Sequence, residues 1–189
     1  MKTKSLLGYA LVLGLALAQT GAPLPPPAPR GSAQVQMAQA TAHGEKAAWE
    51  VAKAQARQAE WQRQRLASPP AWVAQGEALL RQAQADLRAQ RFFQAKERAE
   101  AAKKVFEAAL LLQGQALGKP PKGDVRKAQE KVGRLEAELA YHRQSLPSAQ
   151  TLLQAAKGLL TSQPSPFQLE AARKLADAGR HALKAERGF

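Results

Sequence analysis

Apolar residues recur at intervals of three and four through most of the chain beyond residue 45, which is the spacing of one helix face. Proline and glycine clusters interrupt this pattern, chiefly Ser-Pro-Pro at 68–70 and Gly-Lys-Pro-Pro-Lys-Gly at 118–123. The pattern and its interruptions predict helices at about 45–66, 70–90, 92–115, 124–144, 147–161 and 165–187.

Residues at the expected helix starts have the chemistry of N-caps. Ser68 is expected to cap the second helix, with Pro69 at its first position, and Asp124 to cap the fourth. The segment Ser165-Pro166-Phe167-Gln168 has the pattern of a capping box, in which the side chains of the first and last residues bond each other's backbone.

Four of the expected helices carry an apolar face with the three-and-four spacing of a coiled-coil seam. In the first helix this face consists of Trp49, Ala52, Ala56, Ala59, Arg63 and Leu66. In the third it consists of Phe92, Ala95, Ala99, Ala102, Phe106 and Ala109. In the fourth it consists of Val125, Ala128, Val132, Leu135, Leu139, His142 and Leu146, and in the sixth of Leu169, Ala172, Ala176, Gly179 and Leu183. Small residues at these positions allow close helix packing, with aromatic residues filling the wider gaps.

An internal repeat suggests how the helices are grouped. Residues 95–106 align without gaps with 172–183, and a Leu-Leu pair lies ahead of each segment, at 79–80 and at 152–153. Two copies of a three-helix unit, 45–116 and 124–187, would account for the alignment, although any two Ala-rich amphipathic helices look alike. The expected fold is all-α: antiparallel helical hairpins in a bundle, as two tandem three-helix units with coiled-coil-like seams.

Composition agrees with an all-α fold. The chain is rich in Ala, Gln, Leu, Arg and Glu and contains no Asn, Ile or Cys. The absence of Cys excludes disulfides and a lipid-modified cysteine. The missing Asn and Cys are typical of a thermophile, and a GC-rich genome would have the same effect.

Residues 1–18 have the pattern of a bacterial signal peptide. Lys2 and Lys4 precede an apolar run from Leu6 to Leu17, and small residues lead to an expected cleavage site after Ala18. This run is shorter than the roughly 20 residues of a membrane span, so cleavage is favoured over retention as an anchor. Residues 19–44 then form a Pro-rich linker and a frayed segment. The expected location is the periplasm or cell envelope of a bacterium.

The net charge of the chain is +13, and removal of Lys2 and Lys4 would lower it by two, to +11. Such a charge favours acidic partners: wall polymers, anionic lipid headgroups, extracellular nucleic acid or acidic proteins. Alternatively, the charges simply keep the outer helix faces solvated, since Glu alternates with Lys and Arg in most helices.

Basic residues are densest around the start of the fourth helix. The candidate contacts for an acidic partner are Lys119, Lys122, Arg126, Lys127, Lys131 and Arg134. Of these, Lys127, Lys131 and Arg134 follow the spacing of one helix face. A second basic set, Arg57, Arg63 and Arg65, lies near Trp61, which could stack on a base. Nucleic acid is the less favoured partner.

No residue pattern indicates catalysis, a metal or a cofactor. The histidines, at 43, 142 and 181, lack metal-ligand spacing, and His142 is expected to hydrogen-bond a facing side chain. The carboxylate pairs Glu97 with Glu100 and Glu136 with Glu138 are interpreted as solvated ion-pair faces, because basic residues flank both. No Gly-x-Ser-x-Gly motif is present. The chain is therefore not expected to be an enzyme.

Between Leu80 and Ala109, the order Leu, Ala, Leu, tight turn, Phe93, Ala95, Ala99 and Ala102 resembles a tetratricopeptide-like helix-turn-helix unit. It is similar to an uncharacterised bacterial envelope family of Ala-rich hairpins, often found beside OmpA-like domains. The resemblance covers about a third of the chain and implies a scaffold that holds another protein, with no catalytic residues. Residues 160–163, Leu-Thr-Ser-Gln, also resemble the Leu-Thr-x-x-Gln signature of small exported helical chaperones, but are one residue short.

The sequence thus predicts an exported, non-enzymatic envelope protein that acts as a structural or adaptor module for protein–protein interaction. The alternative is a protein that binds polyanions, either wall polymer or extracellular nucleic acid, or a small periplasmic chaperone. Whether the Ala-rich seams close within one chain or between two remains open at this level, so an oligomer is compatible with the pattern.

Overall fold

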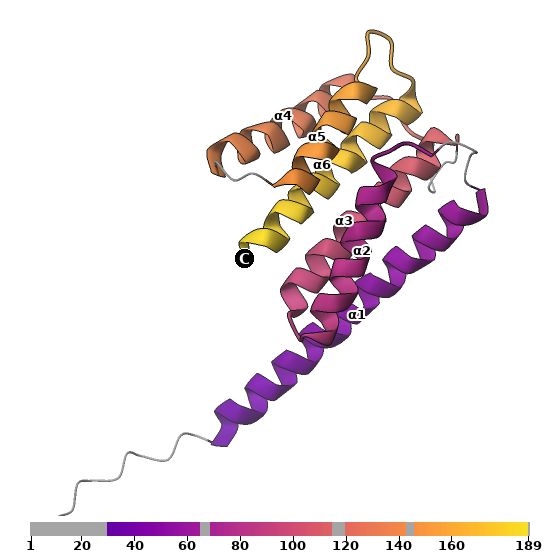
Figure 1. Ribbon diagram of the computed structural model, residues 1–189. Coiled ribbons are helices and arrows are strands. Elements are labelled where there is room, and N and C mark those ends of the chain that lie inside the picture. Colours follow the sequence, from indigo (N-terminus) through magenta and orange to yellow (C-terminus); the bar gives the residue numbers. More distant parts are fainter. Residues whose placement is uncertain (1–29, 65–68, 115–119, 143–145, 189) are drawn as a thin grey trace, which may run out of the picture.

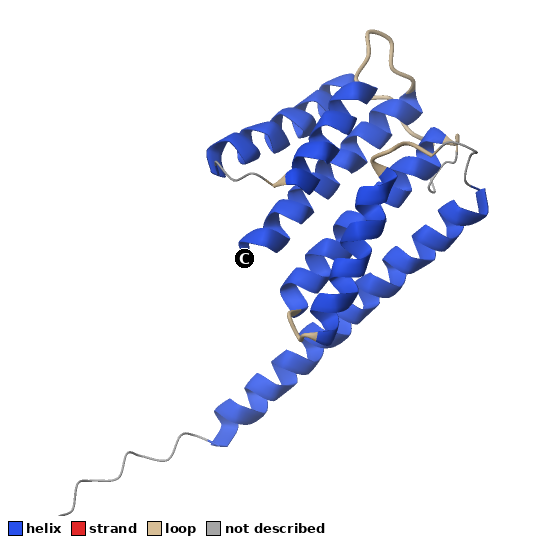
Figure 2. Cartoon of the chain, in the orientation of Figure 1, coloured by secondary structure: helices blue, strands red, loops and turns tan. Residues whose placement is uncertain are grey.

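The computed structural model describes residues 30–64, 69–114, 120–142 and 146–188, and these are helices joined by short loops and turns, with no strand (Figures 1 and 2). The helices are α1 (Arg30–Gln64), α2 (Val73–Arg88), α3 (Phe92–Leu112), α4 (Val125–His142), α5 (Pro147–Leu159) and α6 (Pro166–Arg187). The predicted all-α class is confirmed. The predicted signal peptide, residues 1–18, lies outside the described residues.

Two of the predicted helix caps are present. Gln168 N donates to Ser165 Oγ at 3.2 Å, and Ser165 N donates to Gln168 Oε1 at 2.7 Å, which completes the capping box of α6. Lys127 N donates to Asp124 Oδ1 at 3.0 Å at the start of α4. Each cap gives a partner to a backbone N–H that the first turn of a helix leaves unpaired.

The starts of the first two helices differ from the prediction. α2 begins at Val73, so Pro69 is not its first residue; Val73 N instead donates to the Pro70 carbonyl at 3.0 Å, in a turn that precedes the helix. Ser68 lies outside the described residues. α1 begins at Arg30 rather than at about residue 45. The Pro-rich stretch ends at Pro29, and no Pro follows until Pro69, so nothing interrupts the helix.

Helices α3 and α6 form the centre of the fold. α3 packs against α1 and α2, α6 packs against α4 and α5, and the contact of α3 with α6 is the most extensive in the molecule (Figure 1). Apolar residues of all six described helices join in one buried cluster. The helices thus form two sets of three, around α3 and around α6, and the two sets share one core.

The face that joins α3 to α6 combines alanines with charges. Ala101 and Ala108 of α3, and Ala171, Ala178 and Ala185 of α6, are buried. They alternate at helical spacing with Glu97 and Lys104 on α3 and with Lys174 and His181 on α6. Glu97 contacts His181, and Glu107 contacts Lys174, so the two helices run antiparallel.

The seams predicted for α3, α4 and α6 close within the chain. The inner positions are buried: Ala95, Ala99, Ala102, Phe106 and Ala109 in α3; Ala128, Val132, Leu135 and Leu139 in α4; Leu169, Ala172, Ala176, Gly179 and Leu183 in α6. Val125, at the start of α4, is exposed. His142 accepts a hydrogen bond from Arg187 Nη1 at 2.9 Å if its Nε2 is unprotonated, as expected for a seam position.

The prediction that the seam face of α1 packs on the core is wrong. Its Trp49 is 64% exposed, and Ala52, Ala56 and Ala59 are also exposed. α1 instead turns the opposite side inward, where Ala47, Val51, Ala54 and Trp61 are buried. Trp61 stacks on Phe106 of α3 with ring centroids 6.1 Å apart, and this aromatic contact fixes which side of α1 faces the core.

Gly179 brings α4 close to α6. A Cβ at this position would lie 2.5 Å from Leu135 Cδ2, and Leu135 is fully buried, so its side chain has little room to move. Gly133, on the outer side of α4, has no atom within 4 Å of such a Cβ. The two glycines thus form a matched pair for testing close packing.

We expect Gly179→Ala to destabilise the protein by about 1–3 kcal/mol, because overpacking outweighs the better helix propensity of alanine. Gly133→Ala should stabilise it by roughly 0.5–1 kcal/mol through propensity alone. Urea unfolding followed by circular dichroism measures both changes. Equal effects of the two substitutions would contradict a tight α4–α6 contact.

Candidate functional site

A basic surface lies where the loop before α4 packs on the start of α6. Gly123 has a φ of +67°, and a Cβ there would lie 3.2 Å from Pro166, so the loop passes close to the first turn of α6. Asp124 ends the loop; its carboxylate accepts from Lys127 N and pairs with Lys127 Nζ at 3.3 Å. The backbone hydrogen bond from Lys127 lowers the pKa of Asp124, which stays ionised as the cap of α4.

Between the loop, α4 and α6 is a shallow pocket of about 270 Å³. Its charged lining residues are Lys122, Asp124, Lys127, Glu170, Arg173 and Lys174. Arg173 Nη1 donates to Glu170 at 2.6 Å, while the buried Arg173 Nε has no partner among the described residues. The lining therefore holds four cations against two carboxylates.

The structure divides the six predicted basic residues into three groups. Lys122 and Arg126 are exposed and make no ion pair within the described part of the chain. Lys127, Lys131 and Arg134 are paired, with Asp124, with Asp177 of α6 at 2.5 Å and with Glu138 at 3.3 Å respectively. Lys119 lies outside the described residues. Lys131 thus links α4 to α6. Among the described members of the predicted set, only Lys122 and Arg126, near the loop, carry unpaired charge.

The second basic set does not combine charge with an accessible aromatic. Trp61 is 3% exposed and stacked on Phe106, so its ring faces cannot receive a base. Arg57 Nη1 pairs with Glu60 at 2.5 Å, and its Nε lies 3.9 Å from Glu107. Arg63 is exposed, and Arg65 lies outside the described residues.

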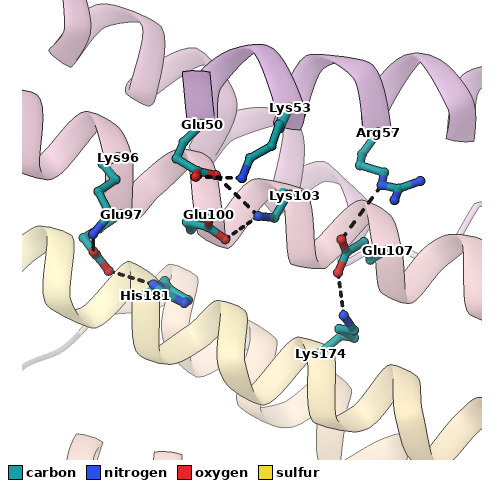
Figure 3. A network of polar contacts seen from close by, with 10 residues as sticks. All are labelled: Glu50, Lys53, Arg57, Lys96, Glu97, Glu100, Lys103, Glu107, Lys174 and His181. Atoms are coloured by element: carbon teal, nitrogen blue, oxygen red, sulfur yellow. Dashed lines mark hydrogen bonds and ion pairs between the residues drawn. The ribbon is translucent and has the colours of Figure 1, made fainter. Parts of the chain in front are cut away.

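A network of buried and half-buried charges joins α1, α3 and α6 (Figure 3). Glu107 is central to one end, because its carboxylate lies 3.9 Å from Arg57 of α1 and 2.7 Å from Lys174 of α6. In the middle Lys103 lies 2.6 Å from Glu100 and 3.4 Å from Glu50 of α1, and Glu97 with His181 forms the other end. Lys174 belongs both to this network and to the pocket, so the pocket is fixed to the centre of the fold.

Glu97 is 4% exposed and lies in the same network. Burial raises the pKa of this carboxyl, but hydrogen bonds from His181 at 2.7 Å and Lys96 at 2.9 Å outweigh it and bring the pKa to about 2. Burial likewise opposes ionisation of Glu100, yet contacts with Glu50 and Lys103 lower its pKa to about 2. Both carboxylates are therefore ionised at neutral pH. Glu97 joins α3 to α6 through His181, while Glu100 pairs with Lys103 within α3.

The interpretation of Glu97 and Glu100 as a solvated face was wrong, because α6 and α1 cover this side of α3: Glu97 contacts His181 of α6, and Glu100 contacts Glu50 of α1. Glu136 does fit that description: it is exposed and pairs with Lys157 at 2.5 Å. Sequence reasoning also missed Asp86, which is 1% exposed and pairs with Arg91 at 2.6 Å and with Arg98. The sequence did contain a signal for this buried carboxylate, because Asp86 lies at helical spacing from Leu79 and Ala83 on the apolar face of α2.

Within the described residues, no three His, Cys, Asp or Glu side chains group as metal ligands would. No helix in that part of the chain has both the length and the apolar character needed to cross a bilayer. Burial and the charge of the pocket residue Lys174 lower the pKa of Lys104 on α3. What the surface offers is a set of fixed cations that can bind carboxylate or phosphate groups.

The depressed pKa of Glu97 predicts how stability depends on pH. The stabilisation is present above the ordinary carboxyl pKa of 4.5 and is lost as pH falls toward 2. We expect Glu97→Gln to unfold more easily than the natural chain by about 2 kcal/mol at pH 6, and this difference to vanish near pH 2. Urea unfolding across this range measures it, with the exposed Glu136→Gln as the control. A difference independent of pH would contradict the ion pair.

Comparisons with known proteins assign no function to this geometry. A scan against protein-family models and searches of curated proteins and of solved structures found no match to the chain. The proposal that follows rests on the residues and contacts described above.

Proposed function

We propose that this protein is an exported, non-enzymatic adaptor of the bacterial cell envelope that docks an acidic protein on the surface around Lys122, Arg126 and Lys127. The pattern of residues 1–18 supports export. The fold supports a scaffold role, because one buried apolar cluster joins all six described helices and so gives them a fixed outer surface.

The convergence of cations from α4 and α6 on one pocket is the observation that carries the proposal. Lys122 and Lys127 come from the loop and α4, and Arg173 and Lys174 from α6. Ion pairs hold Arg173 and Lys174 in place, so a carboxylate entering the pocket meets donors that are already oriented. Preorganised donors lose less conformational entropy on binding than free surface lysines.

The same geometry favours an acidic protein over nucleic acid. Binding to single-stranded nucleic acid commonly combines a basic groove with aromatic rings on which bases stack. None of the described lining residues of the pocket is aromatic, and Trp61, beside the second basic set, is buried. Short side chains such as Asp or Glu, carried on a peptide, fit a shallow pocket of this size.

The test is charge reversal at the rim, with Lys122→Glu, Arg126→Glu and Lys127→Glu combined. Lys131 and Arg134 are left unchanged, because Lys131 links α4 to α6 through Asp177, and Arg134 shares Glu138 with Arg180 of α6. The pair of Lys127 with Asp124 lies within the first turn of α4, where the backbone bond of the cap does not depend on the Lys127 side chain. We expect at least a tenfold loss of the acidic partner in crosslinked pull-downs from the envelope fraction, run at low and at high salt, since several charge-assisted contacts are lost together.

The matched control reverses three exposed cations elsewhere, Arg81→Glu, Arg88→Glu and Lys184→Glu, and so changes the net charge by the same amount. Retention of the partner by this control would locate binding at the pocket. Equal losses from both triple variants, together with a steep dependence on salt, would instead indicate polyanion binding through net charge and would overturn the adaptor proposal.

A further inference from the structure

The outward face of α1 has the heptad spacing of a seam, and none of the described helices packs against it. Its positions are Glu45, Trp49, Ala52, Ala56, Ala59 and Arg63, all exposed. The core-facing residues Ala47, Ala54 and Trp61 lie on the opposite side of the same helix. α1 is therefore amphipathic in an unusual way, with one apolar face inside the molecule and another outside it.

The seams of α3, α4 and α6 pack within the chain. The α3–α6 contact shows that a helix face of alanines and charges can pack against another helix. That contact joins alanines with residues of opposite charge, Glu97 with His181 and Glu107 with Lys174, between antiparallel helices. The outward face of α1 has a related composition, with alanines at its centre and opposite charges at its two ends. Neither Glu45 nor Arg63 makes an ion pair with another described residue.

We propose that a second copy of this chain covers the face, through an antiparallel coiled coil between the α1 helices. One register satisfies every position. Ala52 lies opposite Ala56 of the second copy, Trp49 opposite Ala59, and Glu45 opposite Arg63. By symmetry each of these pairs occurs twice, and the seam is about 27 Å long at 1.5 Å per residue.

Charge and size both select the antiparallel direction. A parallel pair in register would place Glu45 against Glu45, Arg63 against Arg63 and Trp49 against Trp49. The antiparallel register replaces the like charges with opposite charges and sets each large ring against a small alanine. Central alanines allow the two axes to approach to the near end of the usual 8–10 Å range.

The residues beside the seam agree with this register. In an antiparallel coiled coil, equivalent flanking positions meet across the two-fold axis, which brings Lys46 near Glu60 of the second copy. Lys53 meets its own counterpart at the axis, but Glu50 of the same chain already pairs with it at 2.7 Å and offsets the repulsion. Opposite-charge pairs therefore outnumber like-charge pairs along the whole contact.

The test exploits the charges at the ends of the seam. Because Glu45 and Arg63 are exposed and unpaired in one copy, Glu45→Arg and Arg63→Glu should each leave the fold intact, which circular dichroism checks. Sedimentation of the purified chain should show a dimer that dissociates on dilution. Each single variant places like charges at both ends and should weaken the dimer at least about tenfold.

Mixing the two single variants should restore the dimer. At one end of the mixed seam, the arginine introduced into one chain faces the glutamate introduced into the other, and at the other end the natural Glu45 and Arg63 face each other. The double variant Glu45→Arg with Arg63→Glu should also dimerise, because it keeps opposite charges at both ends. Arg81→Glu, which changes the net charge as Arg63→Glu does, should have no effect.

A monomeric natural chain would mean that another partner or a lipid surface covers the face, and would overturn the proposal. A dimer insensitive to both single variants, or not restored on mixing, would also overturn it.

Discussion

The antiparallel packing of α3 on α6 determines where every other helix can lie. Alanine at most of the contact positions allows the two helices to approach closely, and the remaining positions carry charges that must find partners because the approach excludes water. Glu97 and Glu107 find them in His181 and Lys174. Once this contact is formed, α3 still has two apolar faces, which α1 and α2 cover. α6 likewise has two, which α4 and α5 cover.

The helices themselves were predictable because their signals are local. The capping box at Ser165 and the cap at Asp124 require only neighbouring residues, and the seams of α3, α4 and α6 require only regular spacing. The α3–α6 face was not predictable in the same way. Glu97, Lys174 and His181 have the composition of a solvated helix face, and only the tertiary fold brings them to their partners across the contact.

The candidate surface was predictable in part for the same reason. Lys122, Arg126 and Lys127 are close together along the chain, so their proximity could be read directly from the sequence. Arg173 and Lys174 reach the pocket because the loop before α4 packs on α6 around Gly123, a contact between segments far apart in sequence. The α1 seam illustrates a further limit: heptad spacing identifies an apolar face but does not say whether the same chain or another covers it.

The central position of α3 and α6 has a consequence for how the molecule can move. Each outer helix depends mainly on one central helix, so α1 or α4 can detach by breaking one broad contact and a smaller one with its outer neighbour. Neither α3 nor α6 can open without releasing three neighbours. Local opening should therefore proceed from the outside inward, with the two central helices forming the last cooperative unit to lose its structure.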